Sequence, residues 1–177
     1  MAIESLFWKE ELSRIAKNIR PVARPKRWSE RAVCTIERDV IIGFFIIRRL
    51  IELNKVSSRI GDLKLDVFGT PTTKNVDKIN RYSFDENYDW KSEKAEKKPV
   101  LYISNQCIHS YLSRVERGRD RNWSDFFVVS DFDRNAKIWR IPFATIIGLF
   151  ETASKDWPAE IRMTFDAKLN DYKMKTD

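Results

Sequence analysis

The most apolar run in this chain is Val40–Ile47, with the sequence VIIGFFII, and it constrains the fold more than any other stretch. On a helix, two turns of continuous apolar residues place hydrophobic side chains on every side, so such a helix is expected to be buried all round. Phe44 and Phe45 lie on different sides of that helix. Both are therefore predicted to be buried.

The residues around this run indicate a helix over about 29–53. Ser29 is a suitable N-cap, and Arg48 and Arg49 lie near the other end, where the helix dipole favours cations. Valine, isoleucine and phenylalanine also favour strands, but the pattern is far longer than a typical strand. Gly43 is a poor helix former, which points to close packing against another backbone.

A membrane span is the other interpretation of this stretch, and the flanking charges argue against it. Spanning a bilayer takes about 20 predominantly apolar residues, whereas Glu37–Asp39 and Arg48 close the run on its two sides. The first residues, MAIESLFWKEEL, carry acids where a secretory signal would be basic. The sequence therefore predicts a soluble, cytoplasmic protein.

The chain is expected to form a single α+β domain over residues 1–177. One face of its sheet is expected to be covered by helices within 99–166, and the other face by the buried helix at 29–53. Residues 1–60 are predicted to be an N-terminal helical layer, in which Trp8, Leu12 and Ile15 recur at helical spacing before the buried helix begins. Residues 69–98 are mostly polar and are predicted to be a long excursion, partly ordered by its aromatic residues.

The segment 99–166 is predicted to be the sheet core. Its patterns favour a strand at Val100–Ile103, a helix over 104–116, a hairpin, a helix after Pro142 and a strand at 161–166. That order, βαββαβ, is the order of the ferredoxin-like motif. A mixed or antiparallel α+β sheet with another strand order is the alternative. Residues Asn170–Asp177 are predicted to be a polar tail.

Positive charge is concentrated between residues 14 and 31. The net charge of +7 makes an anionic partner plausible, and Pro21 and Pro25 keep the middle of this stretch from being helical. Trp8 and Trp28 flank it and could stack on bases. The candidate nucleic-acid-binding residues, opposed in this range only by Glu30, are Arg14, Lys17, Arg20, Arg24, Lys26, Arg27 and Arg31.

His109 is the only histidine and the one candidate catalytic residue. Near neutral pH a histidine can transfer protons, as metal-independent RNA cleavage requires. If 104–116 is a helix, Asn105, Gln106 and Ser113 share its polar side with His109. The other interpretation is a surface histidine making ordinary hydrogen bonds.

Glu37 and Arg48 are the candidate residues of a polar pocket. They are eleven residues apart and so lie on nearly the same side of the predicted helix. If that side is buried, both charges need a partner or a cavity, because an unpaired buried ion is costly. The alternative is that both helix ends emerge into water.

No metal site and no cofactor are predicted. A structural zinc site takes four nitrogen or sulfur ligands, whereas this chain has one histidine and two scattered cysteines, Cys34 and Cys107. Both cysteines are predicted to be small buried hydrophobic residues. The favoured function is binding of RNA or DNA through the basic stretch. The alternatives are a protein-interaction or regulatory module and a ribonuclease centred on His109.

Overall fold

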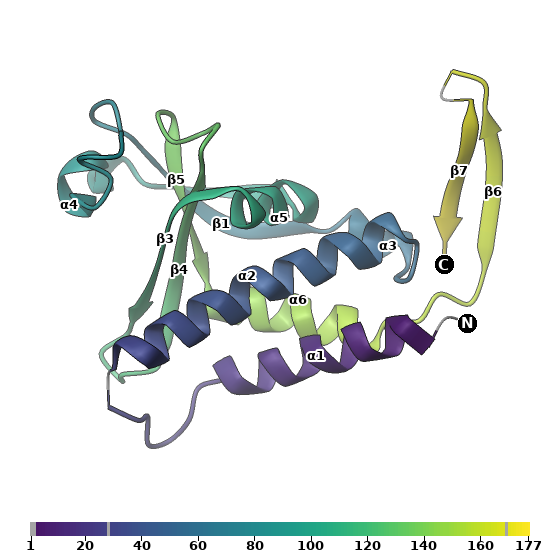
Figure 1. Ribbon diagram of the computed structural model, residues 1–177, viewed down its shortest axis with the longest axis horizontal. Coiled ribbons are helices and arrows are strands. Elements are labelled where there is room, and N and C mark those ends of the chain that lie inside the picture. The colour runs from purple at the N-terminus through teal and green to yellow at the C-terminus, as the bar shows by residue number, and fades with distance from the viewer. Residues whose placement is uncertain (1–2, 28, 169) are drawn as a thin grey trace.

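The computed structural model describes residues 3–27, 29–168 and 170–177. They form an α+β fold in which helices pack on an antiparallel sheet (Figure 1). The helices are α1 (Ile3–Ile19), α2 (Glu30–Glu52), α3 (Ser58–Gly61), α4 (Phe84–Asn87), the 3-10 helix η1 (Trp90–Ser92), α5 (Val100–Ile108) and α6 (Phe143–Lys155). The strands are β1 (Lys64–Pro71), β2 (Lys94–Pro99), β3 (Ser110–Arg117), β4 (Trp123–Ser130), β5 (Lys137–Pro142), β6 (Ile161–Asp166) and β7 (Asp171–Thr176).

Five strands form one sheet in the order β2-β1-β5-β4-β3, and β6 and β7 form a separate hairpin. Every neighbouring pair in the large sheet is antiparallel. The predicted α+β class is confirmed, and the predicted buried-helix segment at 29–53 forms helix α2. In the described parts of the chain, no helix is long and apolar enough to cross a membrane.

Helix α2 is the predicted central helix, and its N-cap is as expected: the Ser29 hydroxyl accepts a hydrogen bond from the Ala32 N–H at 3.2 Å. It packs against α1, α5 and α6, which leaves one side open to solvent (Figure 1). Phe44 is fully buried, whereas 41% of Phe45 and 38% of Ile42 are exposed. The prediction that Phe45 is buried is therefore wrong, because three neighbouring helices do not surround a fourth completely.

Gly43 lies where α2 meets α6. A Cβ atom at this position would lie 2.3 Å from the Phe150 ring. Gly43 does permit a close approach, but the neighbour is an aromatic side chain, so the predicted packing against another backbone is wrong. The prediction that both cysteines are buried holds for Cys107 and is wrong for Cys34, which lies exposed on the solvent side of α2.

The two faces of the sheet are covered by different parts of the chain. Alternate residues of β4 and β5, including Phe126, Val128 and Trp139, join the core formed by α1, α2, α5 and α6. The intervening residues, including Phe127 and Ile138, pack against an aromatic cluster from segment 73–92. Helix α2 was expected to cover the second face, but all the large helices lie on the first face.

The aromatic cluster on the second face consists of Phe84, Tyr88 and Trp90 against Phe127. The Phe84 ring meets the Phe127 ring edge-to-face at a centroid distance of 5.1 Å. Segment 69–98, predicted as a polar excursion, therefore supplies the cover of a sheet face. The Lys/Glu tract at the end of this segment, Lys91–Lys98, is also ordered, because Lys94–Pro99 is the edge strand β2.

The predicted ferredoxin-like order over 99–166 is wrong, and the observed order is α5-β3-β4-β5-α6-β6. Val100–Ile108 is a helix because its buried residues, Val100, Ile103, Ser104 and Cys107, recur at helical spacing. Residues 110–117, expected to continue a helix, form strand β3 paired with β4. The strand predicted at 161–166 is β6. It pairs with β7, which is formed by the expected tail, and does not join the large sheet.

Tyr88 leads to a prediction about stability and pH. Its buried hydroxyl has no hydrogen-bond partner among the described residues, and burial raises the pKa of Tyr88 to about 12. Removing an unpaired buried hydroxyl relieves its desolvation cost, so Tyr88→Phe should raise the free energy of unfolding at neutral pH by about 1 kcal/mol. Urea unfolding measures this change, with the exposed Tyr82→Phe as control.

The same pair of variants tests the sign of the pH effect. Between pH 10 and 12 the unfolded chain loses the phenol proton while the folded chain keeps it, so rising pH lowers the free energy of unfolding. The wild type should lose up to about 2.7 kcal/mol more than Tyr88→Phe over this range, for a shift of about two pKa units. A variant less stable than wild type at neutral pH would contradict this account of Tyr88.

Candidate nucleic-acid interface

A basic pocket lies where the connector between α1 and α2 meets the turn between β3 and β4. Helix α1 ends at Ile19, and Pro21 and Pro25 keep the following chain out of a helix. Asn122 of the turn holds this connector with two hydrogen bonds. Its side chain accepts from the Val22 N–H at 2.9 Å and donates to the Val22 carbonyl at 3.3 Å.

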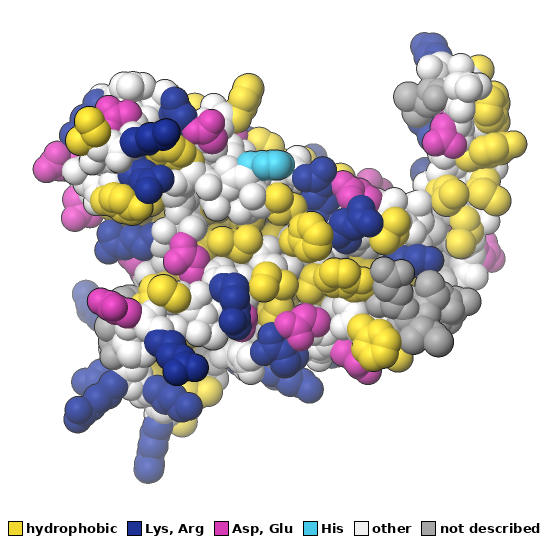
Figure 2. Space-filling model, in the orientation of Figure 1, with side chains coloured by type: hydrophobic (Ala, Val, Ile, Leu, Met, Phe, Trp, Pro, Cys, Tyr) yellow, Lys and Arg dark blue, Asp and Glu magenta, His cyan; other side chains and the backbone are white. Residues whose placement is uncertain are grey.

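The pocket has a volume of about 440 Å³, and none of the described residues that line it is acidic. Its walls come from the end of α1, the connector, the first turns of α2 and the β3–β4 turn. Figure 2 shows Lys and Arg side chains gathered around the α1–α2 connector, at the lower left of the view. The basic residues that line the pocket are Arg20, Lys26, Arg31, Arg117 and Arg121.

Two of these five cations already have partners. Arg20 donates from Nε to the Glu151 carboxylate of α6 at 2.7 Å. Arg117 stacks over the Trp123 ring at 4.2 Å and donates to the Lys26 carbonyl at 2.9 Å. These contacts make both arginines part of the pocket wall.

The other three cations are better placed to meet a ligand. Within the part of the chain that the structure describes, Lys26, Arg31 and Arg121 have no carboxylate within ion-pair distance. Arg121 has a φ of 65° at the tip of the β3–β4 turn, where its N–H donates to the Gly118 carbonyl at 2.9 Å. The N-terminus of α2 also borders the pocket and adds the positive end of its dipole. An anion entering here meets three cations that have no carboxylate partner.

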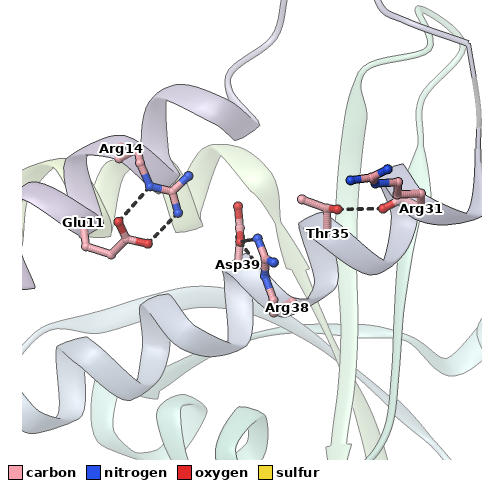
Figure 3. A network of polar contacts seen from close by, with 6 residues as sticks. All are labelled: Glu11, Arg14, Arg31, Thr35, Arg38 and Asp39. Carbon is pink, nitrogen blue, oxygen red and sulfur yellow. Dashed lines mark hydrogen bonds and ion pairs between the residues drawn. The ribbon is translucent and has the colours of Figure 1, made fainter.

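The structure brings together only part of the predicted basic stretch. Arg20, Lys26 and Arg31 line the pocket, whereas Lys17, Arg24 and Arg27 are exposed outside its walls. Arg14 points along α1 to Glu11 and donates to it from Nε at 2.7 Å (Figure 3). Trp28 lies outside the described residues, and Trp8 packs against Phe45 instead of lining the pocket.

Sequence reasoning missed Arg117 and Arg121. A sequence pattern that favours nucleic-acid binding is present here: residues 117–123 read RGRDRNW, with three arginines and a tryptophan in one short turn. What the sequence did not show is that this turn lies beside the connector about a hundred residues earlier in the chain. The Asn122–Val22 hydrogen bonds make that juxtaposition.

Glu37 and Arg48 are not brought together by the structure. Glu37 accepts a hydrogen bond from the Ser113 hydroxyl of β3 and lines a second pocket of about 480 Å³ between α2 and β3. Arg48 lies further along α2 and donates to Glu52 at 2.7 Å and to Asn105 at 3.0 Å. Each charge has its own partner.

The predicted surroundings of His109 are also different. It is exposed and caps the C-terminus of α5, where its N–H donates to the Asn105 carbonyl at 3.0 Å. Gln106 is buried and donates to Asp133, and Ser113 lies on β3 instead of on the same helix. A catalytic role for His109 stays a prediction, but the polar helix side that suggested it does not exist.

Comparison of the chain with protein-family models, with curated proteins and with solved structures finds no match. The described residues contain no group of three or more His, Cys, Asp or Glu side chains that could hold a metal ion. Inference about function therefore starts from the basic pocket.

Proposed function

We propose that the protein binds nucleic acid, with the phosphate backbone seated in the basic pocket between the α1–α2 connector and the β3–β4 turn. The observation that carries this proposal is the lining of the pocket: five cations, no acid, and three of the cations without a carboxylate partner among the described residues. Phosphate contacts supply most of the affinity in sequence-independent binding.

The pocket also supplies an aromatic surface. Trp123 lies on its wall, with the Arg117 guanidinium stacked over the ring. Exposed aromatic rings and arginine planes stack on bases of single strands without regard to sequence. The favoured ligand is therefore a single strand, whose bases can turn toward the wall while its phosphates meet the cations.

The test replaces the three available cations, Lys26, Arg31 and Arg121, with glutamine and measures binding of labelled single-stranded and duplex RNA and DNA by fluorescence anisotropy. Each neutralised phosphate releases counterions, so three lost contacts should flatten the log–log salt slope by about 2 on single strands and about 2.7 on duplex. Binding should weaken about equally for all sequences.

A matched control removes the same charge elsewhere. Lys78, Lys91 and Lys94 are exposed on the segment that covers the far sheet face and on β2. Replacing all three with glutamine lowers the net charge by the same amount as the pocket variant but does not touch the pocket. It should therefore leave most of the log–log salt slope unchanged. If the wild type binds no RNA or DNA at low salt, the proposal is wrong and a protein-interaction role becomes the better explanation.

A further inference from the structure

The C-terminal hairpin, β6 and β7, extends from the body of the molecule as an arm (Figure 1). It is fixed at its base, where the Thr176 N–H donates to the Ser58 hydroxyl at 2.9 Å and the Thr176 hydroxyl donates to the Val56 carbonyl at 2.8 Å. Beyond that base its strands pair only with each other. A lone two-stranded hairpin is at best marginally stable in water, so this arm needs a cover.

The two faces of the arm differ sharply in chemistry. Residues directly opposite on paired strands point to the same face, and Met163 lies opposite Met174 as Phe165 lies opposite Tyr172. With Ile161 these residues form one apolar face, which we call the inner face. The other, outer face is polar and carries both signs of charge: Arg162, Thr164, Asp166, Asp171, Lys173 and Lys175. Between 44% and 62% of each inner-face residue is exposed.

The inner face meets the body only at the base of the arm, among the contacts of the described residues. At the base of the arm, the Met174 sulfur accepts a hydrogen bond from the Asn54 amide at 3.4 Å, and Met174 lines a pocket with Ile51, Val56 and Leu101. Further out, the space between arm and body is open (Figure 2). The arm and the body thus form a hook, and the rest of the apolar face, beyond Met174, is left without a cover by the body.

We propose that the inner face binds the inner face of a second copy, so that two hooks interlock about a two-fold axis. Such an interface is self-complementary: each copy supplies the same apolar surface, and the charged outer faces point away from each other. The two hairpins then stack as a small sandwich about 10 Å thick, which gives both of them the cover that they lack.

The exposed area is sufficient for a stable dimer. Five large side chains, each about half exposed, offer roughly 500 Å² per copy if a whole side chain counts for roughly 200 Å². Leu53 and Leu101 at the base of the hook are also exposed. With them, two copies bury roughly 1,300 Å², within the range of specific interfaces. A monomer seldom leaves such a contiguous apolar face in water.

The test is the molar mass of the full-length protein by sedimentation equilibrium over about 1 to 200 µM, since interfaces of this size span affinities from micromolar to picomolar. The expected mass rises to twice the chain mass of 21.0 kDa. Replacing Phe165 and Tyr172 with serine should weaken the dimer about tenfold or more, the scale of a truncated interface aromatic. The matched control, Arg162→Ser with Lys175→Ser, changes the directly opposed outer-face pair and should leave the dimer intact.

A cross-linking measurement separates loss of the interface from unfolding of the arm. In a Cys34→Ser background, Met163→Cys places a thiol on the inner face and Arg162→Cys places one on the outer face. Stacked sheets are too far apart for a disulfide, so a short bismaleimide is the reagent. Met163→Cys should form covalent dimers much faster than Arg162→Cys. A monomer at every concentration, a dimer that ignores the inner-face change, or equal cross-linking from both faces would overturn the proposal.

Discussion

Phe44→Ala should lower the free energy of unfolding by about 3–5 kcal/mol, the largest effect that we expect from one substitution in this protein. Phe44 is fully buried, and its ring meets the Phe150 ring edge-to-face at a centroid distance of 5.4 Å. Truncation removes the transfer free energy of the ring and leaves a cavity between α2 and α6. Urea unfolding, with the midpoint lowered and the m-value unchanged, is the measurement.

Its neighbour Phe45 provides the matched control. The residue type, the helix and the substitution are the same, but two fifths of Phe45 is exposed and its main aromatic contact is Trp8, at 6.2 Å between centroids. Phe45→Ala should cost only about 1 kcal/mol, because much of the ring is already in water. Equal losses at the two positions would mean that α2 has no solvent side.

Gly43→Ala should produce the second large decrease in the free energy of unfolding, because it overpacks the contact between α2 and α6. The new methyl group would lie 2.3 Å from the Phe150 ring, so either the ring or the two helices must move. Such insertions cost about 1–3 kcal/mol, even though alanine favours a helix more than glycine does. Phe150→Leu should relieve part of this cost, and a double-mutant cycle by urea unfolding gives the coupling between the two sites.

Gly148→Ala in α6 is a control for which the expected change in the free energy of unfolding has the opposite sign. Nothing lies within 4 Å of a Cβ atom there, and the position is exposed. The change should stabilise the protein by about 0.5–1 kcal/mol through helix propensity alone. If Gly43→Ala also stabilises, the close contact between α2 and the Phe150 ring is not maintained in solution.

The elements that depend on local pattern could be predicted from the sequence. The N-cap Ser29, the extent of α2 and the start of α6 after Pro142 all follow from signals within one or two turns. Val100–Ile103 was wrongly predicted as a strand because its apolar residues are compatible with one, although Val100, Ile103 and Cys107 recur at helical spacing. The exposure of Phe45 was beyond the sequence, since it depends on how many helices surround α2.

The basic pocket was predictable only in part, for a similar reason. The charge and the prolines of the connector are visible in its sequence, so Lys26 and Arg31 were predicted as binding residues. Arg117 and Arg121 join the pocket only because the β3–β4 turn docks on Val22 through Asn122. A juxtaposition across a hundred residues leaves no periodic signal in either segment.

The charged strand β2 has a consequence for how this protein behaves at high concentration. It is an outer strand of the sheet, and open strand edges are templates on which other chains can add and aggregate. Lys94, Lys97 and Lys98 are spaced along β2, and Pro99 ends it without a backbone donor. Natural sheets use lysine and proline in this way to discourage edge-to-edge pairing. The Lys/Glu tract thus protects this side of the sheet against fibrillar growth.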